Sequence, residues 1–144
     1  SWCAYYTHHY VRTEMAGTPS FIFTPRENSV NVALDNTNRD GSGTVSSLII
    51  GASAGTKINE IVAQATVTTT AGMIRVFLST DGATTWRLFD ELPISANTVS
   101  ASNGGLRVAK TYSNLILDDS NCELGVTTHN SESINVFALG GDLT

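Results

Sequence analysis

Hydrophobic and polar positions alternate in short runs between Lys57 and Glu91, and turn residues separate the runs. From residue 59 to residue 68, apolar or small residues alternate with polar ones. Asn59, although polar, falls on the same side of the alternation as the apolar residues. This is the period of a strand that has one buried and one exposed face. After a break at Gly72 the alternation resumes over residues 73–78, and another run surrounds Trp86. The pattern predicts three consecutive antiparallel strands, a meander, at the centre of one β-sandwich.

The dipeptide Asp81-Gly82 separates the second and third of these predicted strands, and it is a strong hairpin sequence. Residues 79–86 resemble the Asp box of sialidase-type propellers, with Ala83 in place of the second glycine. In that motif the aspartate caps the turn and the aromatic ring packs beneath it. One copy in 144 residues is too little for a propeller. We therefore expect a purely structural hairpin formed by Ser79, Asp81, Gly82 and Trp86.

The two-residue period recurs from Val30 to Leu139, and no stretch of helical length has the period of an amphipathic helix. Further strands are expected at residues 21–23, 30–34, 44–50, 106–112, 114–117, 121–128 and 133–140. Prolines flank the first of these, which favours the edge of a sheet. Eight to ten strands predict an all-β fold, a single antiparallel β-sandwich of the jelly-roll kind. We expect residues 1–25 to form an N-terminal arm and edge strand, and residues 26–144 the sandwich.

The first fourteen residues differ in composition from the rest of the chain, since they hold three of the four tyrosines and one of the two tryptophans. Aromatic rings bury a large area with few rotatable bonds, so an aromatic arm is a credible anchor. Two origins of this segment stay open: a native arm, or an extension upstream of a translation start at Met15. As an arm it is expected to bind a partner through Trp2, Tyr5, Tyr6, Tyr10, Phe21 and Phe23.

The balance of charges argues against several classes of partner. The formal net charge is −5, and the eight Lys and Arg residues are scattered, whereas binding to a nucleic-acid backbone needs clustered positive charge. No apolar run approaches the ~20 residues of a membrane-spanning helix. The start has no basic region followed by an apolar one, so no signal peptide is expected. Cys3 and Cys122 form neither a disulfide framework nor a metal-binding spacing, and two free thiols are expected.

Candidate chemistry is sparse. Asp118 and Asp119 begin an oxygen-rich turn that could hold calcium, but the full series of ligands is missing and a plain turn is expected. Asp90 and Glu91 are neighbours in a strand, so they point to opposite faces and cannot act together as acid and base. His129 has no nucleophile motif or second metal ligand nearby, and we expect it to hydrogen-bond within a loop. We expect no cofactor, no metal and no catalysis.

Three strings carry a resemblance to a known family: residues 65–78 (ATVTTTAGMIRVFL), residues 88–94 (LFDELPI), and residues 127–138 (TTHNSESINVFA) with the closing Gly140-Gly141-Asp142. Together they resemble a family of small structural proteins of tailed bacteriophages. The resemblance extends from Ile58 to Thr144, and residues 1–55 carry none of it. It implies a virion component: a head decoration (cement) protein, a head spike or fibre piece, or a tail protein.

Under this resemblance the most concrete expectation is a non-enzymatic cement protein on the outer surface of a phage head. Its partners would be capsid or other virion proteins, and it would form a homo-oligomer, with a trimer preferred. An acidic chain of pI 4.9 fits an outer surface better than contact with packaged DNA. The alternatives are a carbohydrate-binding β-sandwich module and a tail or fibre adhesion protein. Burial of Trp86 by its hairpin would leave few aromatic rings for a sugar platform.

Overall fold

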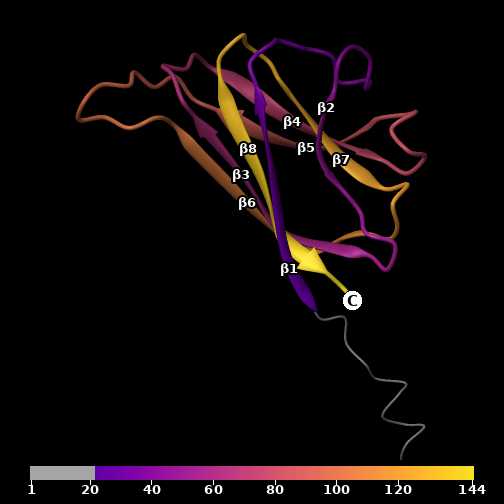
Figure 1. The fold of residues 1–144 in the computed structure, drawn as a ribbon. Coiled ribbons are helices and arrows are strands. Elements are labelled where there is room, and N and C mark those ends of the chain that lie inside the picture. Colours follow the sequence, from indigo (N-terminus) through magenta and orange to yellow (C-terminus); the bar gives the residue numbers. More distant parts are fainter. Residues whose placement is uncertain (1–21) are drawn as a thin grey trace, which may run out of the picture.

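The computed structural model describes residues 22–144, which form two antiparallel sheets of four strands each (Figure 1). These residues include no helix that could cross a membrane. The predicted all-β sandwich is confirmed. Its strands are β1 (Thr24–Val32), β2 (Ser46–Ile50), β3 (Thr56–Ala65), β4 (Gly72–Ser79), β5 (Arg87–Ile94), β6 (Arg107–Leu117), β7 (Glu123–Thr128) and β8 (Ile134–Asp142).

The strands pair from the two ends of the described chain inward, first with last and second with second-to-last. Strand β1 pairs with β8, β2 with β7, β3 with β6 and β4 with β5. The first sheet, sheet A, has the order β1-β8-β3-β6, and the second, sheet B, has the order β2-β7-β4-β5. This is the topology of an eight-stranded jelly roll. The strands at the two ends of the described chain are therefore neighbours, as Figure 1 shows for β1 and β8.

The predicted meander is wrong, because β3 lies in sheet A whereas β4 and β5 lie in sheet B. Alternation along a strand shows which residues face the core, but it does not show which of the two sheets the strand joins. The hairpin between β4 and β5 is present, and the chain from residue 66 to residue 71 crosses from one sheet to the other. The strands expected at 21–23 and 30–34 are replaced by the single strand β1. Its Pro25 is tolerated because β1 is an edge strand.

The hydrophobic core lies between the two sheets, where alternate residues of each strand are buried. In β3, Ile61, Ala63 and Ala65 face the core as their pattern predicts. Asn59 does not, because the register shifts between Ile58 and Glu60 and leaves Asn59 exposed. Such a bulge inserts an unpaired residue and reverses the alternation beyond it. The largest core residues include Leu48, Ile49, Ile58, Ile74, Leu92, Leu117, Leu124 and Ile134.

The two open sides of the sandwich are closed in different ways. On one side, β1 sends side chains to the backbone of β2: Asn28 Nδ2 donates to the carbonyl of Leu48 at 2.7 Å, and Arg26 Nη2 donates to that of Ile50. On the other side, β6 contacts β5 through Tyr112, whose hydroxyl donates to Asp90 at 2.7 Å. The second side is bridged mainly at this one level, by the bonds of β6 to Asp90.

Candidate functional sites

The face of sheet B that points away from the core is covered, although the sequence predicts an exposed face there. Phe77 is completely buried while lying outside the core cluster, and Arg75 is 2% exposed. The cover includes Trp86: a Cβ added at Gly125, the register neighbour of Phe77, would lie 2.9 Å from the Trp86 ring. The loop of residues 33–45 approaches the same place, since a Cβ at Gly41 would lie 2.1 Å from the Trp86 carbonyl oxygen. The prediction of one wet face is therefore wrong for sheet B.

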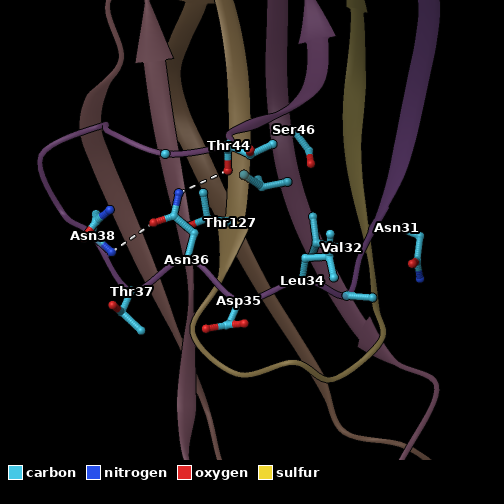
Figure 2. Close-up of a pocket in the computed structure, with 13 residues that line it drawn as sticks. Asn31, Val32, Leu34, Asp35, Asn36, Thr37, Asn38, Thr44, Ser46 and Thr127 are labelled. Carbon is cyan, nitrogen blue, oxygen red and sulfur yellow. Dashed lines mark hydrogen bonds between the residues drawn. The ribbon is translucent and has the colours of Figure 1, made fainter.

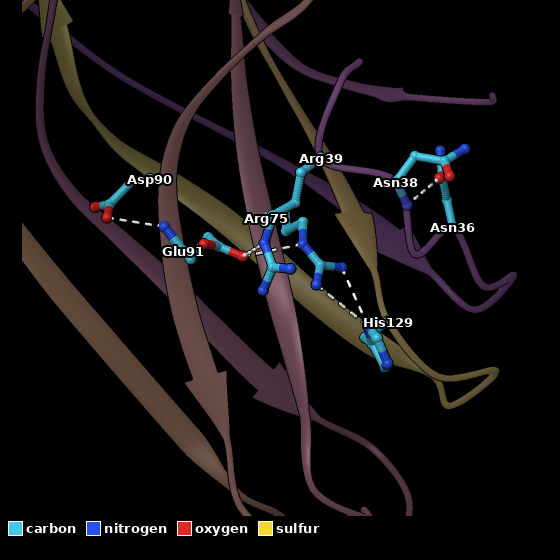
Figure 3. A network of polar contacts seen from close by, with 7 residues as sticks. All are labelled: Asn36, Asn38, Arg39, Arg75, Asp90, Glu91 and His129. Atoms are coloured by element: carbon cyan, nitrogen blue, oxygen red, sulfur yellow. Dashed lines mark hydrogen bonds and ion pairs between the residues drawn. The ribbon is translucent and has the colours of Figure 1, made fainter. Parts of the chain in front are cut away.

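Arg75 is the centre of a polar network on this covered face (Figure 3). Its Nε donates to Glu91 Oε2 at 3.0 Å, and Arg39, from the loop of residues 33–45, donates to the same oxygen at 3.0 Å. Both terminal nitrogens of Arg75 lie 3.2 Å from His129 Nδ1. Because a guanidinium group has donors only, His129 Nδ1 must accept. The expectation that His129 forms hydrogen bonds is confirmed, whereas the burial of Arg75 was not predicted.

Asp90 and Glu91 point to opposite faces of β5, as predicted, and each has its own partners. Asp90 accepts hydrogen bonds from Lys110 Nζ at 2.8 Å and from the Tyr112 hydroxyl at 2.7 Å. Burial raises the pKa of Asp90, but the bonds from Lys110, Tyr112 and the Glu91 N–H outweigh it and hold the pKa below its ordinary value. Burial, and then the adjacent carboxylate, raise the pKa of Tyr112. These groups stabilise the sandwich and leave no free acid–base pair.

The same groups predict how stability depends on pH. The pKa of Asp90 is lowered from 3.8, so its contribution is present above that pH and is lost as the pH falls below it. The pKa of Tyr112 is raised from 10.0, so stability is lost as the pH rises above 10.0, where the unfolded tyrosine ionises first. Urea unfolding from acid to alkaline pH should show both losses. In Tyr112→Phe the alkaline loss should shrink; an unchanged alkaline limb would contradict this role.

The hairpin between β4 and β5 has the bonds expected of a capped turn. Ser79 Oγ donates to Asp81 Oδ1 at 2.8 Å, and the Thr85 N–H donates to the same oxygen at 2.9 Å. These bonds, that of Thr85 first, lower the pKa of Asp81. Gly82 has a φ of +70°, and Ala83, which stands where the Asp box has its second glycine, has a φ of 67°. An alanine in this left-handed region is strained, so the turn depends on its other bonds.

Replacing Asp81 by alanine should therefore lower the melting temperature by a few degrees and leave partner binding unchanged. The turn would lose the acceptor for both Ser79 and Thr85 while keeping its strained backbone. Asp81→Asn is the matched control, because it keeps an acceptor oxygen and should lose less. Thermal unfolding and a binding assay on the same preparations test this. Wild-type stability with lost binding would mean that the turn is a recognition site.

Asp118, Asp119 and Cys122 bring three possible metal-ligand atoms within 4.8 Å of one another. Each is already used in the turn before β7. The Cys122 thiol donates to Asp118 Oδ1 at 2.7 Å, and the Asn121 N–H donates to Asp119 Oδ1 at 2.8 Å. The bond to Asp118, and then burial, raise the pKa of Cys122, which disfavours the thiolate that binds metals. Cys122 is a buried free thiol in the core, as predicted.

A cleft of about 590 Å³ opens beside the end of β1 (Figure 2). Asn36 organises its wall: its side-chain amide donates to the carbonyls of Ser42 and Thr44 at 3.0 and 3.1 Å and accepts from the Asn38 N–H at 3.1 Å. The buried hydroxyl of Thr127 has no hydrogen-bond partner within residues 22–144. The described lining has no aromatic ring and consists of Asn31, Val32, Ala33, Leu34, Asp35, Asn36, Thr37, Asn38, Gly43, Thr44, Ser46, Val126 and Thr127.

The chain enters β1 with its aromatic residue exposed. Phe23 is 78% exposed, although its N–H donates to the Asp142 carbonyl at 2.8 Å and so continues the pairing with β8. Ile22 lies over Gly141, where an added Cβ would be 2.2 Å from Ile22 Cγ2. The other proposed partner-binding residues lie outside the described residues: Trp2, Tyr5, Tyr6, Tyr10 and Phe21.

Comparisons with known proteins find a similarity among solved structures. No protein-family model matches the chain. No curated protein matches it either. Among solved structures, a chain from the capsid of Ralstonia phage GP4 is similar over 88% of this chain and 90% of that chain, with 15% sequence identity and a TM-score of 0.49. A similarity of this strength establishes neither a family nor a function for this protein.

Proposed function

We propose that this chain is a non-enzymatic structural protein of a phage virion, and most concretely a decoration (cement) protein on the outer surface of the head. The sequence resemblance that implies this role falls on framework strands: its three strings lie largely in β4, β5 and the β7–β8 region. Jelly rolls occur in capsid proteins but also in lectins and cupins, so the fold by itself does not select the role.

The chemistry of the described residues supports a structural role. Three of the groups that could act as acid, base or nucleophile are engaged in bonds that hold strands and turns together. Glu91 accepts from Arg75, Asp90 accepts from Tyr112, and the Cys122 thiol donates to Asp118. General acid–base catalysis needs a titratable group placed within reach of a substrate.

The observation that carries the attachment role is the exposure of Phe23 where the chain enters β1. The N–H of Phe23 still donates to the Asp142 carbonyl, so the backbone at Phe23 continues the line of β1 as far as the end of β8. The preceding residues include Trp2, Tyr5 and Tyr6. A segment attached in this way can reach a neighbouring protein, and burial of each ring contributes about 1.5–3 kcal/mol before the cost of ordering the segment. We propose that this arm is the main attachment to neighbouring proteins of the particle.

Deletion of residues 1–20 tests the proposal. The shortened protein should keep its far-ultraviolet circular dichroism and nearly its full melting temperature, because both sheets lie within residues 22–144. Its occupancy on purified particles, measured by quantitative mass spectrometry, should fall steeply. A full-length control in which Thr7 and Thr13 are replaced by serine should bind normally. Full decoration by the shortened protein would contradict the arm and place the contact on the sandwich.

A second candidate is carbohydrate binding, as a module or as part of a tail or fibre adhesion protein. The cleft of Figure 2 favours it, because amide and hydroxyl groups such as those of Asn38, Thr37 and Thr44 match the hydroxyls of a sugar. Against it, the described lining offers no ring for stacking. Titration with cell-surface polysaccharides, compared between wild type and Asn38→Ala, would separate this candidate from the first.

A further inference from the structure

The side of the sandwich between β5 and β6 contains an apolar groove, which we call the β5–β6 groove. It encloses about 440 Å³ and is lined by Leu78, Phe89, Thr111, Tyr112, Ser113, Asn114, Leu115 and Ile116. Both flanking strands are irregular at this level. In β5 the register shifts at Phe89, and in β6 residues 112–114 have no regular partner opposite the bulge of β3. Bulges bend and twist a strand, so the irregular stretches of β5 and β6, which face each other, separate the edges of the two strands here.

The groove presents aromatic and aliphatic surface to solvent. Phe89 is 41% exposed and Ile116 is 43% exposed, although both belong to strands of the sandwich. The rings of Phe89 and Tyr112 pack as a tilted pair with centroids 5.9 Å apart, and Phe89 is partly exposed in spite of this contact. Beneath them, Leu78 is only partly buried against the core. A partner that fills this groove would therefore bury apolar area that the chain itself leaves exposed.

The backbone beside the groove is also available. Within residues 22–144, β5 pairs only with β4, and β6 pairs only with β3. The opposite side of the sandwich differs, because there Arg26 and Asn28 of β1 bond to the carbonyls of β2. An extended segment with aromatic side chains could place rings in the groove and bond to an unpaired strand edge.

The chain itself contains a segment with this chemistry. Residues 1–21 hold five aromatic residues and one charge of each sign, so they are neutral overall at pH 7. Residues 22–144 carry the whole formal charge of −5. The segment itself therefore adds no charge repulsion where it contacts an acidic surface.

The segment joins the sandwich at the edge of sheet A opposite the β5–β6 groove. Residues 1–21 join at β1, and β6 is at the other edge of sheet A, with β8 and β3 between them. The two edges are roughly 14 Å apart at the usual strand spacing. Phe23, the last described residue but one before the segment, continues the line of β1 at this opposite edge.

We infer that the β5–β6 groove receives aromatic side chains from residues 1–21 of a second copy of this chain. This rests on the proposed function, because it names the neighbour to which the arm attaches. Donor and acceptor lie on opposite edges of the sandwich, so the contact is heterologous and closes into a ring when the rotation between copies allows it. A trimer is the ring expected here.

Photo-crosslinking in the full chain tests the inference directly. Equal amounts of ¹⁴N- and ¹⁵N-labelled protein carrying Tyr6→p-benzoylphenylalanine are mixed, irradiated and digested. The expected product joins the arm to peptides of β5 or β6, and mixed-isotope pairs show that the two peptides come from different copies. The inference would be overturned if every cross-link joined peptides of the same isotope, if the cross-links lay on another surface, or if none formed.

A second measurement uses Phe89→Glu, with Val67→Glu as the matched control, since Val67 is 38% exposed and lies outside the groove. Sedimentation equilibrium should show self-association weakened about tenfold or more in Phe89→Glu and unchanged in the control. Equal association of both variants would overturn the inference. If deletion of residues 1–20 abolishes occupancy on particles while Phe89→Glu self-associates normally, the proposed function is retained. The groove is then rejected as the binding site of the arm.

Discussion

Adding one methyl group at Gly140 should lower the free energy of unfolding by about 3 kcal/mol, because the added carbon has no room. An ideal Cβ at this position would lie 1.9 Å from the carbonyl oxygen of Lys57 and 3.0 Å from the Cα of Ile58. Both are backbone atoms of β3. Strand β8 is held between β1 and β3, so neither neighbour can move without breaking its ladder. Urea unfolding of Gly140→Ala measures the loss.

Gly104→Ala is the control for this experiment. A Cβ at Gly104 would have nothing within 4 Å, and its backbone is outside the left-handed region. The expected change is within about 0.5 kcal/mol. If the two alanine variants unfolded at the same urea concentration, the close approach of β8 to β3 would not be a determinant of stability.

Neutralising Glu91 should cost about 2 kcal/mol, because it leaves the buried guanidinium of Arg75 without its countercharge. Arg75 is 2% exposed, and its Nε lies 3.0 Å from Glu91 Oε2. Removal of one member of a fully buried pair costs more, but Glu91 is 28% exposed, so water screens part of the effect. Chemical unfolding of Glu91→Gln tests this value.

Two further variants separate the buried charge from a general effect of losing an ion pair. Arg39→Met breaks the pair to the same carboxylate, but Arg39 is 60% exposed, so the loss should be below about 1 kcal/mol. The double variant Arg75→Met with Glu91→Gln removes both charges and should recover part of the loss seen in Glu91→Gln alone. An equal loss in Arg39→Met and Glu91→Gln would contradict the role assigned to Arg75.

Features set by neighbours in the sequence were predictable. Alternation placed Ile61, Ala63 and Ala65 in the core, and Asp81-Gly82 marked the hairpin between β4 and β5. The opposite directions of Asp90 and Glu91 followed from the period of a strand, and their partners confirm it. In each case a local rule of backbone geometry is sufficient.

Features set by distant parts of the chain were not predictable. The burial of Arg75 depends on Glu91 from β5 and on His129 after β7. The alternation of residues along a strand cannot show that either residue lies beside Arg75. The assignment of β3 to sheet A depends on its pairing with β8, more than 60 residues later in the sequence. The β5–β6 groove arises where the bulges of two strands from different sheets meet. The exposed Phe89 had no distinguishing pattern of its own.

The pairing of the first described strand with the last has a consequence for how the protein is made. The ion pair of Arg26 with Asp142 joins residues 116 positions apart, and β8 is also the strand that links β1 to β3. A topology rich in such distant contacts folds slowly, on the scale of milliseconds to seconds. During synthesis, β1 has no partner strand in sheet A until Ile134–Asp142 has emerged from the ribosome. The segment that precedes β1 would therefore be attached to an incomplete sandwich until β8 has paired with β1.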